Sequence, residues 1–141
     1  MLEFEADKKQ ISLGFREIYD YPVMVRADEE KIEQVLINLI GNSIHYGRQG
    51  GSTVIGIQSI DAERFRIDVV DDGIGISREN LPRLFERFYR ADKSRSRDHG
   101  GSGLGLSIVK HILEAHNQKV SVESKLEKGT TFSLTLNKAN R

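Results

Sequence analysis

The sequence contains no cysteine, and its 141 residues carry as many acidic as basic side chains. Disulfides, thiolate nucleophiles and cysteine-bound zinc are therefore excluded. A formal net charge of zero gives no sign of the basic face expected of a nucleic-acid-binding protein, so no nucleic-acid partner is expected. No apolar run approaches the roughly 20 residues that a membrane-spanning helix needs. The absence of cysteine is compatible with the cytosol.

The composition is that of an ordinary globular protein, with 38% hydrophobic and 30% charged residues. This length suits one domain with a core of its own. The acidic first residues, Met1 to Glu5, do not resemble a signal peptide. We expect residues 1–141 to form a single domain that belongs to a longer protein.

Hydrophobic periodicity predicts an α+β domain. The expected strands are residues 10–15, 23–25, 52–60, 65–70, 120–123 and 131–136. The expected helices are residues 28–46, 77–85 and 104–116. Residues 91–101 are densely charged and aperiodic, which predicts a loop. The layout is a mixed sheet of about five strands with three helices on one face.

The first long helix carries a stripe of polar side chains. Gln34, Asn38, Asn42 and Tyr46 are spaced by four and fall along one face, and His45 lies on the same side. Amide oxygens can ligate Mg²⁺, which prefers oxygen ligands and usually keeps waters and substrate phosphates as well. The alternative is a solvated helix face. The glycine motifs further along the chain favour the ligand site.

A carboxylate stands where the predicted strand 65–70 ends. Asp71 is followed by Gly73 and Gly75, and it can accept a hydrogen bond from an exocyclic amine such as adenine N6. The glycines allow the backbone to approach a flat base closely. A tight turn is the alternative, but the two isoleucines of this segment argue against a plain solvent turn. Asp72 is expected to be exposed, with no assigned role.

A second glycine cluster opens the helix expected at 104–116. Gly101, Gly103 and Gly105 leave backbone N–H groups free near a helix N-terminus, which favours a phosphate site. The sequence has no P-loop motif. It also lacks the Rossmann fingerprint, because Leu106 stands where the third glycine would be needed. A flexible hinge is the alternative.

Residues 85–90 bring aromatic side chains that we expect to anchor the core or a lid. Cationic side chains that could neutralise a triphosphate are Arg87, Arg90, Lys93, Arg95 and Arg97. Arg90 and Lys93 are the first of these to test, and a solvated charge is the alternative for each. The four histidines show no metal-ligand spacing, and no Ser/His/Asp signature occurs.

Taken together, these motifs resemble the catalytic ATP-binding domain of bacterial sensor histidine kinases of the PhoR/WalK type. Their superfamily also includes gyrase B, Hsp90 and MutL. The matching segments are residues 34–46 (N box), 71–76 (G1 box), 85–90 (F box), 101–106 (G2 box) and 129–132 (the closing Gly-Thr element). The resemblance implies the Bergerat α/β sandwich.

The resemblance also implies roles for single residues. Asn42 would ligate Mg²⁺ with Asn38 nearby, and Asp71 would read adenine N6. Residues 91–101 would form the ATP lid. The catalytic set would be Asn38, Asn42 and Arg90. The residues implied to hold ATP are Asn42, His45, Tyr46, Asp71, Gly73, Gly75, Lys93, Gly101, Gly103, Leu104, Gly105 and Thr130.

In this family the γ-phosphate of ATP passes to a histidine on a separate helical dimerisation domain and then to a response-regulator aspartate. The chain lacks that phosphoacceptor motif, so alone it is expected to be a monomer that binds ATP without being a complete kinase. The expected location is the cytoplasm, with a membrane-anchored parent. An anti-sigma-factor serine kinase and a non-catalytic nucleotide-binding module are the alternatives. His45 and Gly47 replace a usual lysine and threonine, so His45 would help with phosphates mainly when protonated.

Overall fold

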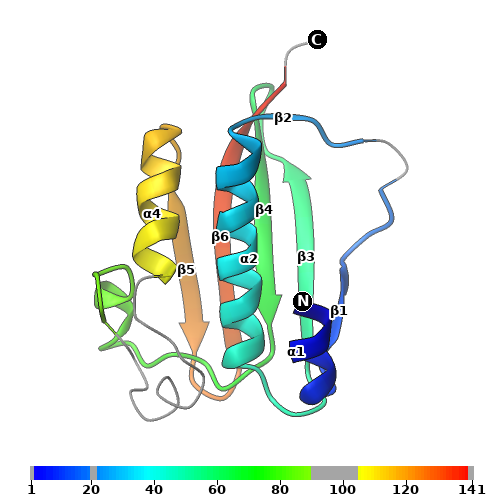
Figure 1. Cartoon of the computed structure of the whole chain (residues 1–141), viewed down its shortest axis with the longest axis vertical. Helices are drawn as coiled ribbons and strands as arrows, with labels where there is room; N and C mark the ends of the chain where they lie inside the picture. The colour runs from blue at the N-terminus through cyan, green and yellow to red at the C-terminus, as the bar shows by residue number, and fades with distance from the viewer. Residues whose placement is uncertain (1, 20–21, 90–104, 140–141) are drawn as a thin grey trace.

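The computed structural model describes residues 2–19, 22–89 and 105–139. The elements are α1 (Leu2–Lys8), β1 (Ser12–Phe15), β2 (Val25–Arg26), α2 (Glu29–His45), β3 (Ser52–Ser59), β4 (Arg64–Asp71), a 3₁₀ turn (Leu81–Arg83), α4 (Gly105–Ala115), β5 (Val120–Lys125) and β6 (Gly129–Lys138). Figure 1 shows α1, α2 and α4 on the same face of the sheet. The α+β prediction is confirmed.

One mixed sheet contains all six strands, where a sheet of about five was expected. The order is β1-β3-β4-β6-β2, and β5 also pairs with β6. Only the β1–β3 pair is parallel among these pairings, and the others are antiparallel. The strand β4 therefore lies in the middle of the sheet. Its C-terminus reaches the same end of the molecule as the C-terminus of α2 and the beginning of α4 (Figure 1).

The helix α2 begins and ends as the sequence predicts. Asp28 is its N-cap, and the carboxylate accepts a hydrogen bond from the Lys31 backbone at 3.1 Å. Glu29 and Glu30 follow in the first turn, where the helix dipole favours negative charge. The helix ends at His45, with Tyr46 as its C-cap. These caps leave the polar stripe on an intact helix.

The core lies between the sheet and the helices α2 and α4. Val69 of β4 and Phe132 of β6 face Leu39 of α2 and Val109 of α4, and all four are essentially buried. Alternation along each strand places apolar residues on this face. Burying a side chain of this size contributes about 1.5–3 kcal/mol relative to leaving it exposed. This packing fixes α2 and α4 side by side over the sheet.

Two hydrogen bonds join α4 to α2 at opposite ends. Near the beginning of α4, the side-chain amide of Asn38 donates to the Gly105 carbonyl at 3.3 Å. Just beyond its C-terminus, His116 Nε2 accepts the Asp28 backbone N–H at 3.0 Å. The other ring nitrogen lies 2.8 Å from the Ile112 carbonyl. His116 therefore has a structural role.

Two local predictions were wrong. The helix expected over residues 77–85 is only a 3₁₀ turn, Leu81–Arg83, and the neighbouring backbone bonds also join residues three apart. Pro82 has no N–H for an α-helical bond, and a segment this short gains little from helix propagation. The first helix, α1, was not expected. Its Ala6 is buried against Ile44 of α2, a tertiary contact with no periodic signal in the sequence.

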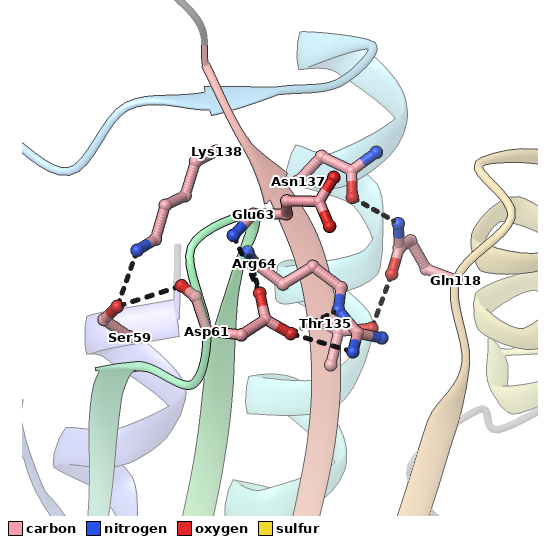
Figure 2. Close-up of polar contacts among 8 residues, drawn as sticks. All are labelled: Ser59, Asp61, Glu63, Arg64, Gln118, Thr135, Asn137 and Lys138. Atoms are coloured by element: carbon pink, nitrogen blue, oxygen red, sulfur yellow. Dashed lines mark hydrogen bonds and ion pairs between the residues drawn. The ribbon is translucent and has the colours of Figure 1, made fainter.

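The β3–β4 hairpin, at the end of the sheet far from Asp71, is held by a polar cluster (Figure 2). Asp61 Oδ1 accepts the backbone N–H groups of Glu63 and Arg64 at 2.8 and 2.7 Å, and Oδ2 accepts the Arg64 side chain. Lys138 of β6 donates to the Ser59 hydroxyl at 2.6 Å. Gln118 connects to Thr135 and Asn137 in the same view. This cluster fixes the hairpin.

Candidate nucleotide site

One residue of the polar stripe of α2, Asn38, contacts the beginning of α4. Asn38 and Asn42 are both half-buried, one turn apart. Since Asn38 Nδ2 donates to Gly105, its Oδ1 is the atom left to face a cation. The structure thus brings together an asparagine of the α2 stripe and a glycine of the cluster that opens α4. Arg90, Lys93, Gly101, Gly103 and Leu104 lie outside the described residues.

Asp71 is buried at the C-terminal end of β4. It lies beside Thr53 of β3 on one side and Thr130 of β6 on the other. Its Oδ1 accepts the backbone N–H of Gly73 at 2.9 Å and that of Thr130 at 3.3 Å. The predicted pair of Asp71 and Thr130 is therefore adjacent in the structure, and the carboxylate is held in one orientation.

Burial is the main influence on the Asp71 carboxyl. Loss of solvent raises its pKa above the ordinary aspartate value, and the nearby charge of Asp72 raises it further. Hydrogen bonds from Gly73, Thr130 and Ser43 act in the opposite direction. Carboxylates with this combination of burial and directed donors are typical of ligand sites.

The glycines after Asp71 are required by the protein itself. A Cβ on Gly73 would lie 2.3 Å from the Tyr46 carbonyl oxygen. Gly75 has a φ of +76°, and a Cβ there would lie 2.2 Å from the Lys125 carbonyl oxygen. The turn is therefore pressed between the C-terminus of α2 and the end of β5. This close packing is a second reason for glycine at these positions, besides the predicted close approach of a base.

Two polar residues of this region were not identified from the sequence. Asp72 accepts the Ser52 backbone N–H at 2.8 Å and so holds the beginning of β3. Ser43 is buried, and its hydroxyl lies 2.7 Å from that of Thr53. The position of Ser43, on the sheet-facing side of a helix, was the available signal. Both residues support the Asp71 end of the sheet.

His45 and Tyr46 lie at the end of α2. Their rings pack edge to face, with centroids 4.6 Å apart. His45 also lines a groove of about 340 Å³ between α1 and α2, together with Leu2, Glu5, Lys8, Lys9, Gly41 and Ile44. The contact of His45 with phosphates stays a prediction, as does the implied role of Tyr46 in holding ATP.

The segment 85–89 anchors aromatic side chains as expected. The Phe85 ring packs edge to face on Phe132 of the core, with centroids 6.3 Å apart. The Tyr89 hydroxyl donates to the Asn80 side chain, and the Arg83 guanidinium lies 4.5 Å from the Tyr89 ring centroid. Phe85 thus attaches this segment to the core, and the other two contacts stabilise the segment itself.

The donor set suits Mg²⁺ carried by a phosphate ligand better than a metal held by the protein alone. Within residues 2–19, 22–89 and 105–139, no cluster of three or more His, Cys, Asp or Glu side chains could hold a metal ion. The oxygens on offer are the neutral amides of Asn38 and Asn42. Mg²⁺ is commonly bound by few protein oxygens together with phosphate oxygens and water.

Comparisons with known proteins agree with this geometry. The model of the histidine kinase-, DNA gyrase B-, and HSP90-like ATPases matches residues 27–140, and the chain belongs to this family. The sensor histidine kinase WalK of Bacillus subtilis is 40% identical over 134 residues, which cover 94% of this chain and 22% of WalK. The chain thus spans about a quarter of the length of its curated relatives.

Two solved kinase structures share the fold. Full-length ShkA in complex with AMPPNP matches with a TM-score of 0.81 and 28% identity over 99% of this chain and 29% of that one. The histidine kinase ThkA in complex with the response regulator TrrA matches with a TM-score of 0.76 and 29% identity over 98% of this chain and 37% of that one. The predicted family, its sensor-kinase branch and the α/β sandwich are confirmed.

In the described part of the chain, no helix is both long and apolar enough to cross a bilayer.

Proposed function

We propose that this chain is the catalytic ATP-binding domain of a sensor histidine kinase. It binds Mg²⁺-ATP and donates the γ-phosphate to a histidine on a helical dimerisation domain of the same parent protein. A response-regulator aspartate then takes the phosphoryl group. The observation that carries this proposal is the buried Asp71 carboxylate, oriented by two backbone N–H groups, together with the Asn38 amide that is hydrogen-bonded to Gly105 at the beginning of α4.

Each part of the ligand has a proposed partner. Asp71 accepts the adenine N6–H, which is a charge-assisted hydrogen bond in a site with little water. The Asn42 and Asn38 amide oxygens hold Mg²⁺, which neutralises the phosphates when it is bound. The backbone around Gly105, with Gly101 and Gly103, binds phosphate oxygens at the beginning of α4. Arg90 and Lys93 add positive charge during transfer.

The partners follow from the same proposal. ShkA was solved with the ATP analogue AMPPNP, which supports ATP as the ligand here. ThkA was solved with a response regulator, which supports a response regulator as the eventual acceptor. We propose that the fragment is a monomer by itself and works in the cytoplasm, where ATP and the response regulator are available.

The direct test is calorimetry with ATP, with and without Mg²⁺, on the native domain, Asp71→Asn and Asp61→Asn. Loss of a hydrogen bond to a charged group costs about 1.5–3 kcal/mol, so Asp71→Asn should weaken binding about 10- to 100-fold. Asp61→Asn is the matched control at the other end of β4 and should bind normally. A folded native domain that binds no ATP would contradict the proposal.

Transfer is tested by adding a WalK segment that carries the phosphoacceptor histidine, together with radiolabelled ATP. The proposal predicts an acid-labile phosphohistidine that depends on Mg²⁺. An acid-stable phosphoserine on another partner would instead support the serine-kinase alternative. ATP binding without any transfer would support a regulatory module.

A further inference from the structure

Three segments meet behind the turn that carries Asp71. They are the end of α2, the turn 73–75 and the β5–β6 turn. The Tyr46 carbonyl accepts the Ile74 N–H at 3.1 Å, and the Ile74 carbonyl accepts the Glu127 N–H at 2.9 Å. The turn is thus held from both sides through backbone groups. These two bonds do not use the Gly73 and Glu127 carbonyls, which can therefore accept hydrogen bonds from other donors.

The Arg48 side chain supplies those donors. Its Nε donates to the Gly73 carbonyl at 3.3 Å. Its Nη2 donates to the Glu127 carbonyl at 3.1 Å and to the Glu127 carboxylate at 2.9 Å. A guanidinium presents several donors in a planar, fixed fork, whereas a lysine ammonium is a single flexible point. Arg48 therefore spans the two turns in a way that lysine could not reproduce fully.

We propose that Arg48 is a positioning residue that fixes the Asp71 turn and thereby sets the preference of the site for an adenine base. The proposal rests on the proposed function and deepens it. The same Gly73 whose carbonyl is bound by Arg48 donates its N–H to Asp71 Oδ1. Without a Cβ, the Gly73 backbone has wide conformational freedom. Holding its carbonyl therefore holds the donor that orients the carboxylate.

The ion pair with Glu127 is the minor part of this arrangement. The Glu127 side chain is 75% exposed and that of Arg48 is 41% exposed, so solvent screens their attraction. The two backbone carbonyls do not depend on the Glu127 carboxylate. Glu127→Gln therefore removes the charge but keeps the proposed function of Arg48, which makes it the matched control.

The test measures Mg²⁺-dependent binding of ATP and of inosine triphosphate by calorimetry. The two nucleotides share the triphosphate, but inosine has no exocyclic amine for Asp71. In Arg48→Ala we expect the Kd for ATP to rise about tenfold and that for inosine triphosphate to change less than threefold. Arg48→Lys should recover part of the preference, and Glu127→Gln should keep it. A folded Arg48→Ala variant with the native preference, or with both affinities weakened equally, would overturn the proposal.

Hydrogen exchange separates this proposal from the proposed function. In the protein without nucleotide, Arg48→Ala should speed exchange of the Gly73 and Thr130 amides, which donate to Asp71, while Glu127→Gln should not. If the native domain binds neither nucleotide, the proposed function fails, and exchange still decides the role of Arg48. Unchanged exchange at both amides in folded Arg48→Ala would contradict it.

Discussion

Asp61 lies in the hairpin before β4 and Asp71 is the last residue of β4, and the two aspartates differ in solvent exposure and in the charge of their neighbours. Asp61 is exposed in the β3–β4 hairpin and pairs with Arg64. A hydrogen bond from the Glu63 backbone, followed by one from the Arg64 side chain, lowers its pKa. Asp71 is buried, and burial raises its pKa. Both accept two backbone N–H groups, so the difference arises from solvent and charge, not from the number of backbone donors.

The comparison separates a carboxylate that stabilises a turn from one that we propose binds a ligand. Asp61 is satisfied by its own hairpin, including a cation. Within the part of the chain that the structure describes, no cation is among the groups that shift the Asp71 pKa, and the charged group among them is the like-charged Asp72. A buried carboxylate without a cation costs stability. Such a cost is typical of a functional group and supports the role proposed for Asp71.

The largest effect on stability is expected where the Asp71 turn is packed most tightly. Gly75 and Gly50 have nearly equal φ values of +76° and +77°. A Cβ on Gly50 meets nothing within 4 Å, whereas one on Gly75 meets the Lys125 backbone. We expect Gly50→Ala to cost about 1 kcal/mol from strain alone. Gly75→Ala should cost at least about 2 kcal/mol more.

Urea denaturation of both variants measures this difference directly. Equal losses would mean that the β5 end moves away from Gly75 at little cost. In that case the Asp71 turn would be as adaptable as an open loop.

A smaller effect is expected from Ser43→Ala. The Ser43 hydroxyl contacts Thr53 and contributes a hydrogen bond that lowers the pKa of Asp71. Its removal leaves a buried Thr53 hydroxyl without this partner, which should cost about 1–2 kcal/mol. It should also raise the pKa of Asp71 further. Thermal unfolding checks the first expectation, and NMR titration of the carboxyl checks the second. An unchanged titration would show that Ser43 does not contact Asp71 in solution.

Much of the fold could be predicted from local sequence signals. The caps of α2, the alternation in β3, β4 and β6, and the apolar spacing of α4 each follow from short-range rules. The helix α1 could not be predicted because a contact distant in sequence, between Ala6 and Ile44, stabilises it. The short helix expected near Pro82 does not form, because the backbone there makes hydrogen bonds between residues three apart despite the helical spacing of its apolar residues.

In the candidate site, too, some residues follow from local sequence signals and others depend on contacts between distant segments. The sequence singles out Asn38, Asp71 and Gly105 because each motif combines residue types that a nucleotide requires. The structure shows Asn38 bonded to Gly105, and nucleotide binding by these residues stays a prediction. The roles of Asp72 and Arg48 could not be predicted, because they depend on which backbone groups the fold brings within reach. For Ser43 the helix position indicated burial, but not the partner, which is the Thr53 side chain. A side chain that donates to a distant carbonyl leaves no periodic pattern in the sequence.

The subtlest expected effect is the pH dependence of stability, because three hydrogen bonds oppose the burial of Asp71. The pKa of Asp71 is higher in the folded protein than in the unfolded chain, so the unfolded chain ionises at a lower pH. The folded state therefore loses stability as the pH rises from the unfolded-state pKa through the folded-state pKa. For Asp61 the folded pKa is lowered, so stability is lost as the pH falls through that value. Above this window, Asp71→Asn should therefore be at least as stable as the native domain, whereas Asp61→Asn should be less stable. At pH values below the pKa values of both groups, each variant should differ little in stability from the native domain, because both carboxyls are then neutral. Urea midpoints from pH 3 to 7 measure the two variants together. If Asp71→Asn were the less stable variant at neutral pH, Asp71 would stabilise the turn as Asp61 does, and the idea of a carboxylate kept for a ligand would fail.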